Sequence, residues 1–157
     1  MIDVLNLQRK IKLNTNEIRI YIARLTSAVE EANERTFSIA FISDKRMTEL
    51  NKFFRGKDST TDVLSFPHEV DVFEGKSDRF SHSDSGTSES VTPNFLGDIV
   101  ISAEQAERQA KENKLSLENE IEQLILHGLL HLCGYDHETD SGQMNRRELD
   151  LRKKLKI

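Results

Sequence analysis

The stretch SLENEIEQLILHGLLHLCGYDH, residues 116–137, predicts one long buried helix at the centre of the molecule. Ser116 is a favourable N-cap, and two glutamates follow it in the first helical turn. The later half, LILHGLLHL, is apolar on nearly every side, which is typical of a helix enclosed by a core. Gly134 can end the helix in a left-handed conformation, so we expect a sharp change of direction there.

Three of the chain's five histidines lie within the last eleven residues of this stretch, at the spacing H-x3-H-x5-H. His127 and His131 share one helix face with Cβ atoms about 6 Å apart, so both imidazoles can reach one metal ion at about 2.0–2.1 Å. A turn through Gly134 can return His137 to that face as a third ligand. The alternative, that these histidines only pack or cap, would leave two buried imidazoles to find hydrogen-bond partners on one apolar stripe. Three histidines with an open fourth position are typical of a catalytic zinc ion.

Other residues near the motif have simpler interpretations. Cys133 falls on a different side of the helix, where a small buried thiol is its expected role. Asp136 either orients a ligand imidazole or forms the turn. His68 and His82 lie in a polar segment, where solvation explains them, and we place neither in the site.

The reaction expected of such a metal is hydrolysis. The spacing H-x3-H-x2-G-x2-H is similar to that of metzincin zinc peptidases, whose catalytic glutamate directly follows the first histidine. Gly128 occupies that position here, so the peptidase base is missing. A zinc ion without this glutamate still lowers the pKa of bound water to about 7 and polarises a phosphoryl or acyl oxygen. The motif therefore predicts a hydrolase and leaves its substrate open.

A second informative stretch, NKFFRGKDSTTDVLSF at residues 51–66, carries positive charge in an acidic chain. The cations in and near it are Arg46, Lys52, Arg55 and Lys57. Such a cluster suits a phosphate, because the guanidinium of Arg55 offers a planar fork of donors. Arg55 could equally pair with Asp58 or Asp62, and the sequence leaves both readings open.

Composition limits the class of protein. A chain of 157 residues, 36% hydrophobic and 31% charged, is the right size for one domain spanning residues 1–157. The net charge of −5 argues against a general polyanion binder, so any nucleic-acid site must be local. With one cysteine, no run of 18 apolar residues and no secretion signal, we expect a cytoplasmic protein with no membrane association.

Hydrophobic periodicity predicts alternating strands and helices. The expected strands are residues 3–8, 37–43, 61–67 and 95–102. The expected helices are residues 14–29, 44–54, 103–112, 116–133 and 141–155. Residues 68–94 are rich in Ser, Asp and Glu and follow no period, so we expect a mobile surface insertion there.

Three blocks of this sequence resemble the YbeY family of endoribonucleases, also called rRNA maturation factors. They are N-x3-R-G-K-D-x2-T-D-V-L-S-F-P at residues 51–67, L-G-D-I at 96–99 and H-G-x-L-H-L-x-G-Y-D-H at 127–137. They occur in the family's order over about the last two-thirds of the chain. The histidine block is highly specific.

The resemblance implies an α+β, zincin-like fold. A small mixed sheet of about four strands would pack against helices, with the H-x3-H motif on a central buried helix. It also implies one zinc ion, for which His127, His131 and His137 match the ligands. Arg55 matches the family's functional arginine, which is expected to bind phosphate.

The implied activity is that of a single-strand-specific endoribonuclease in which zinc-activated water attacks an RNA phosphodiester. The implied roles are maturation of the three-prime end of 16S rRNA and ribosome quality control. The partners would be single-stranded ribosomal RNA and ribosomal particles or ribosomal proteins, and the oligomeric state stays open.

This sequence departs from the family pattern in two places. It has a long acidic insertion before Pro93, and it has Cys133 where leucine is common. Because of these departures, the sequence does not predict which residues form the rim of the substrate site. Two alternative functions also remain, a zinc metallopeptidase and a non-catalytic ribosome-assembly factor with a structural metal.

Overall fold

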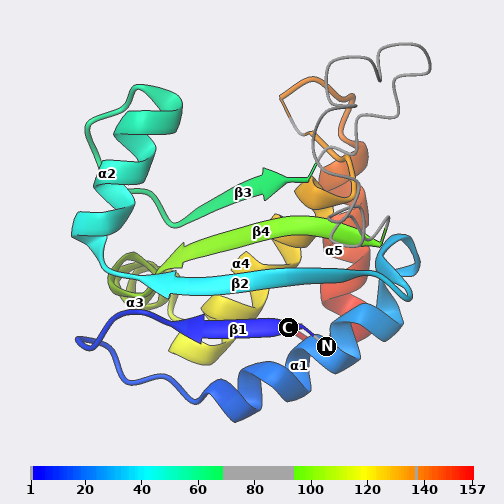
Figure 1. Ribbon diagram of the computed structural model, residues 1–157. Coiled ribbons are helices and arrows are strands. Elements are labelled where there is room, and N and C mark those ends of the chain that lie inside the picture. The colour runs from blue at the N-terminus through cyan, green and yellow to red at the C-terminus, as the bar shows by residue number, and fades with distance from the viewer. Residues whose placement is uncertain (1, 69–93, 137) are drawn as a thin grey trace, which may run out of the picture.

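The fold is organised by a mixed β-sheet (Figure 1). The computed structural model describes residues 2–68, 94–136 and 138–157. Within these residues the strands are β1 (Asp3–Asn6), β2 (Thr36–Ile42), β3 (Val63–Pro67) and β4 (Phe95–Ser102). They form one four-stranded sheet in the order β1-β2-β4-β3. The first three strands of that order are parallel, and β3 pairs with β4 in the antiparallel sense at one edge.

Five α-helices occupy the segments that the periodicity predicts among the described residues: α1 (Thr15–Ala28), α2 (Asp44–Arg55), α3 (Ala103–Asn113), α4 (Leu117–Leu132) and α5 (Gln143–Leu155). A short 3₁₀ helix that was not predicted, η1 (Glu30–Ala32), follows α1. Four of the α-helices begin at a side-chain cap, where the side-chain oxygen accepts a hydrogen bond from a backbone N–H three residues on. The capping residues are Asn14, Ser43, Ser102 and Ser116. The prediction of an α+β fold with a small mixed sheet against helices is confirmed.

The main core lies between the sheet and helices α1, α4 and α5, and Figure 1 shows α4 crossing behind the sheet. Alternate residues of β2 face this core: Phe37, Ile39 and Phe41 are all buried. On α4, nine of the sixteen residues are buried, as the predicted apolar helix requires. The helix with the histidine motif is therefore held on several sides by packed side chains, which fixes its direction.

Gly128 marks the closest approach of α4 to the sheet. A Cβ atom at this position would lie 2.9 Å from Ile99 Cγ2 and 3.2 Å from Ser65 Oγ, so a larger residue would force the helix away. Ser65 Oγ also donates a hydrogen bond of 3.3 Å to the Gly128 carbonyl. The glycine thus brings α4 directly onto β3 and β4.

The predicted insertion at residues 68–94 falls mainly on residues 69–93, which lie outside the described residues. Its two described ends are fixed to the sheet. The His68 N–H donates to the Leu96 carbonyl at 2.9 Å, and the Asn94 carbonyl accepts from the Thr36 N–H at 2.8 Å. In the part of the chain that the structure describes, no helix has the length and apolar character needed to cross a membrane.

Candidate active site

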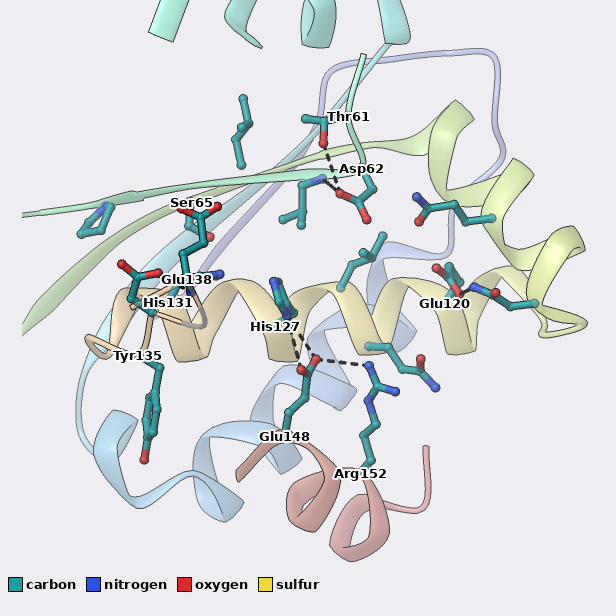
Figure 2. A pocket seen from close by; sticks show the side chains of 18 of the residues that line it. Thr61, Asp62, Ser65, Glu120, His127, His131, Tyr135, Glu138, Glu148 and Arg152 are labelled. Atoms are coloured by element: carbon teal, nitrogen blue, oxygen red, sulfur yellow. Dashed lines mark hydrogen bonds and ion pairs between the residues drawn. The ribbon is translucent and has the colours of Figure 1, made fainter. Parts of the chain in front are cut away.

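A cavity of about 1190 Å³ lies between strand β3 and helix α4 (Figure 2). Its walls come from β3, α4 and α5, from the turn between α4 and α5, and from the end of α3. Small-molecule pockets are usually about 300–1,000 Å³, so this cavity has room for a segment of a polymer. Both informative stretches of the sequence contribute residues to it.

His127 and His131 line this cavity from neighbouring turns of α4. Their ring centroids are 4.8 Å apart and the ring planes meet at 78°. Two imidazoles on one helix face at this spacing fit a single metal ion bound by one nitrogen of each ring. His137, the predicted third ligand, lies outside the described residues. Within those residues, no group of three His, Cys, Asp or Glu side chains is placed to hold a metal ion.

Glu148, on α5, contacts the first of these histidines. His127 Nδ1 lies 3.3 and 3.4 Å from the two carboxylate oxygens of Glu148, as Figure 2 shows. A proton on Nδ1 donates to this carboxylate and leaves Nε2 as the ring nitrogen with a lone pair. Arg152, one helical turn later on α5, contacts the same carboxylate at 3.2 Å. This pattern of carboxylate behind imidazole is common at metal-binding histidines.

The carboxylate of Glu148 is only 7% exposed. Burial acts to raise its pKa, but the hydrogen bond from His127, together with the charge and hydrogen bond of Arg152, outweighs this and holds the pKa below its ordinary value. The sequence prediction missed this residue. A signal was present, because Glu148 falls on the same stripe of α5 as the buried residues Met144, Leu151 and Leu155. A charged residue on an apolar stripe indicates a buried partner.

The turn after α4 is held by residues of the histidine motif itself. Gly134 has a φ of +102°, which confirms the predicted change of direction. Asp136 Oδ1 accepts a hydrogen bond of 3.0 Å from the Glu138 N–H, so the structure favours the turn-forming reading of this aspartate. The hydroxyl of Tyr135 donates to Glu31 of η1 at 2.8 Å, and its ring extends away from the two imidazoles (Figure 2).

Arg55 is the last residue of α2, and it lines the same cavity as the two histidines. Its side chain is exposed. Within the described residues it forms no ion pair with Asp58 or Asp62, so the surface-pairing alternative gains no support. The loop that follows is fixed, since the Asn51 amide donates to the Ser59 carbonyl at 2.8 Å.

The part of the cavity wall next to α3 is polar. Asp62 and the buried Glu120 both line it, and the Asn113 amide donates to Glu120 Oε2 at 3.2 Å. With its amide nitrogen facing the two carboxylates, Gln109 donates to Asp62 Oδ2 at 3.2 Å and to Glu120 Oε1 at 3.1 Å. The sequence prediction did not include this group, because its members come from three separate segments.

Of the residues that the sequence excludes from the site, the two that the structure describes do not line the cavity. Cys133 is half-buried and does not line the cavity. Burial raises the pKa of its thiol to about 11, which suits an unreactive side chain. His68 is exposed and also absent from the cavity lining, and His82 lies outside the described residues.

Comparison with known proteins assigns this chain to a family. A protein-family model described as "Endoribonuclease YbeY" matches residues 3–156. This chain belongs to the YbeY family. A YbeY endoribonuclease of Nautilia profundicola is 37% identical over 145 residues, covering 92% of this chain and 89% of the relative. One of Syntrophus aciditrophicus is 34% identical over 154 residues, covering 96% and 86%.

A solved structure shares the fold. The solution structure of TM1509 from Thermotoga maritima has a TM-score of 0.61 to this chain and 24% sequence identity, and the match covers 99% of this chain and 89% of the other. At that identity the likeness supports the fold alone. The prediction of a YbeY family member, an enzyme of the endoribonuclease class, is confirmed by the family match.

Proposed function

We propose that this chain is a single-strand-specific, zinc-dependent endoribonuclease that acts in the cytoplasm in rRNA processing. Its roles would be maturation of the three-prime end of 16S rRNA and ribosome quality control, with ribosomal particles or ribosomal proteins as partners. One observation carries the proposal: His127, His131 and Arg55, from distant parts of the sequence, line the same cavity in a member of an endoribonuclease family. We also propose a single zincin-like domain over residues 1–157.

The residues that would hold the ion are His127, His131 and His137. The first two support this by their shared helix face, their ring spacing of 4.8 Å and the carboxylate behind His127. When bound, a zinc ion supplies Lewis acidity, which activates water and polarises an oxygen of the phosphodiester.

The chain's own residues have separate tasks in this proposal. The guanidinium of Arg55 binds the scissile phosphate through two parallel hydrogen bonds and offsets the charge that develops on it. Glu148 keeps the imidazole of His127 oriented into the cavity. Strand β3 forms the opposite wall and confines the RNA strand between itself and α4.

Two other functions remain as alternatives. A zinc metallopeptidase would need a base directly after the first histidine, and a side chain at residue 128 has no room against Ile99. A non-catalytic ribosome-assembly factor would bind ribosomal particles and leave RNA intact. The presence of Arg55 in the same cavity as His127 and His131 supports phosphate chemistry and disfavours the peptidase.

The test combines metal analysis with cleavage assays. Purified protein should contain about one zinc per chain and should cleave single-stranded RNA, with duplex RNA and casein left intact. A chelator should stop the cleavage. Zinc-replete protein that leaves single-stranded RNA intact would contradict the proposal, and cleavage of casein would favour the peptidase.

Single substitutions test the role of each proposed site residue. His127→Ala, His131→Ala and His137→Ala should each lower zinc content and bring the melting temperature toward that of metal-free protein. Arg55→Ala should keep zinc and fold but lower RNA cleavage by about 10²-fold or more. Arg55→Lys keeps the charge without the planar fork, so it should restore little activity. Parent-like cleavage by Arg55→Ala would remove this residue from the site.

A further inference from the structure

Two phenylalanines at the end of α2 are unusually exposed. Phe53 is 82% and Phe54 57% exposed, although burying a phenylalanine side chain is worth about 1.5–3 kcal/mol. The other large hydrophobic side chains exposed to this degree among the described residues are aliphatic: Leu5, Leu7, Ile20 and Leu149. The aromatic character of the pair therefore needs its own explanation.

The two rings form an ordered group. The Phe53 and Phe54 centroids are 4.8 Å apart, with the ring planes at 76°. Phe54 also meets Phe66 of β3 edge to face, with centroids 5.0 Å apart. Phe66 packs against the small core of Ile42, Met47 and Leu64. The ring of Phe54 thus packs against Phe66, while the ring of Phe53 is largely exposed to solvent.

This group adjoins the cavity of the candidate active site through Arg55, the residue after Phe54, which lines that cavity. On the edge strand β3, Ser65 and Pro67 line the cavity, while Phe66 points to the opposite face of the sheet together with Leu64. The aromatic group and the cavity therefore lie on the two sides of this edge strand.

Lys52, Arg55 and Lys57 flank the two phenylalanines in the sequence, and all three are exposed. Within the described part of the chain none of these three cations forms an ion pair. In a chain of net charge −5, this is a local surface suited to a polyanion.

We propose that Phe53 and Phe54 form a stacking platform for bases of single-stranded RNA that leads the strand into the cavity. The inference rests on the proposed nuclease function and extends it to how the substrate is bound. Aromatic faces beside cations are the common means of holding single strands, because every unpaired base has a π-face and every nucleotide a phosphate. A duplex keeps its bases stacked internally and offers none to the platform. The platform therefore gives a physical basis for single-strand selectivity.

Charge favours RNA over a protein partner as the occupant. Lysine is depleted at protein–protein interfaces, and a protein partner would have to match or desolvate Lys52, Arg55 and Lys57, which form no ion pair among the described residues. A phosphate backbone matches them directly.

The absence of tryptophan from this chain allows a direct test. Phe53→Trp introduces one fluorophore at the platform. Zinc-loaded Phe53→Trp protein would be titrated with a phosphorothioate-linked single-stranded oligoribonucleotide, which resists hydrolysis, and with an abasic strand of equal length and charge. We expect the base-containing strand to quench the fluorescence and the abasic strand to leave it nearly unchanged. Equal responses to the two strands would overturn the stacking platform.

Affinity measurements complete the test. Loss of one stacked base is worth about 1–3 kcal/mol, so Phe53→Ala should weaken binding of the single strand about 5- to 100-fold. Phe53→Tyr keeps the π-face and should bind like the parent. Ile20→Ala, which removes another exposed apolar side chain (64% exposed) from α1, is the matched control and should leave affinity unchanged.

The outcomes separate the platform from the nuclease. If the parent binds and cleaves RNA while Phe53→Ala binds it equally well, the platform is wrong, the nuclease stands and a protein partner becomes the better occupant. If the parent neither binds nor cleaves single-stranded RNA, the nuclease and the platform are both wrong. A loss of affinity in Phe53→Ala with parent-like zinc content and melting temperature supports both.

Discussion

Glu148 contacts Nδ1 of His127 and so helps to orient its imidazole. Glu148 is buried, and Arg152 contacts the same carboxylate. A carboxylate in this position raises the basicity of the opposite ring nitrogen and restricts rotation of the ring. It would therefore strengthen His127 as the metal ligand that we propose, without contacting the metal.

The first prediction concerns this effect. Glu148→Gln keeps the size of the side chain but removes its charge, so zinc affinity should fall by about 10- to 100-fold. Competition with a chromogenic chelator measures the affinity directly. Glu112→Gln is a matched control, because Glu112 is an exposed carboxylate at the far end of the same cavity and should leave zinc affinity unchanged. Equal affinity in Glu148→Gln and the parent would contradict the positioning role.

At the scale of residues, the sequence was sufficient to predict contacts between side chains that lie close together in the chain. His127 and His131 were predicted because a spacing of four on one helix is sufficient to bring two side chains together. Glu148 follows His127 by 21 positions and meets it through the packing of α5 on α4, which no spacing encodes. The same holds for the polar wall of Gln109 and Glu120, which depends on how α3 lies beside α4.

At the scale of elements, hydrogen bonds to Glu31 hold the turn after α4 and the helix α5 against η1. Glu31 of η1 accepts hydrogen bonds from Tyr135 at 2.8 Å and from the guanidinium of Arg147 at 2.7 and 3.2 Å. This one carboxylate joins η1 to the turn after α4 and to α5, which lie more than 100 residues later in the sequence. The pKa of Glu31 falls from an ordinary 4.5 to about 2, chiefly through the hydrogen bond from Arg147.

This pKa gives the second prediction a definite sign. A carboxylate with a lowered pKa in the folded state contributes stability that is full above about 4.5 and is lost as the pH falls toward about 2. Glu31→Gln should therefore be less stable than the parent at pH 7, and the gap should narrow between pH 4.5 and 3. Urea unfolding of metal-free protein at several pH values measures it, since metal-free samples exclude the pH dependence of zinc binding. A gap that stays constant across this range would show that Glu31 carries no such contribution.

The bounds of the elements were predictable to within a few residues, because caps and periodicity act locally. Asn14 and Ser116 fixed two helix starts, and Gly134 fixed the end of α4. The direction of β3 was not predictable, since a short strand reads the same in parallel and antiparallel pairing. Gly128 shows a further limit: the sequence reveals that the peptidase glutamate is missing, but the approach of α4 to Ile99 explains why no side chain fits there.

At the scale of the whole molecule, the positions of the charged residues say more about ligand binding than the net charge does. The chain is acidic overall, yet Lys52, Arg55 and Lys57 follow one another closely at and just beyond the end of α2. Arg55 lines the cavity, and so do the acidic residues Asp62 and Glu120. A local excess of cations in an acidic chain favours binding of a polyanion there and keeps nonspecific binding elsewhere on the surface weak.

The third prediction concerns the segment between β3 and β4, which we propose to be a surface insertion. The antiparallel pair of Pro67 with Gly97 and the hydrogen bond from the His68 N–H to the Leu96 carbonyl hold the two ends side by side, whatever connects them. Deleting residues 75–92 should therefore change the free energy of unfolding by less than about 1 kcal/mol, because loop-closure entropy varies by only about 0.6 kcal/mol for each doubling of loop length. Zinc content should also match the parent. Urea unfolding and metal analysis of the deletion variant measure both, and loss of a cooperative transition would show that the segment is part of the folded core. A variant that keeps its fold and zinc but cleaves RNA more slowly would instead assign the segment to the substrate rim, beside the exposed end of β3.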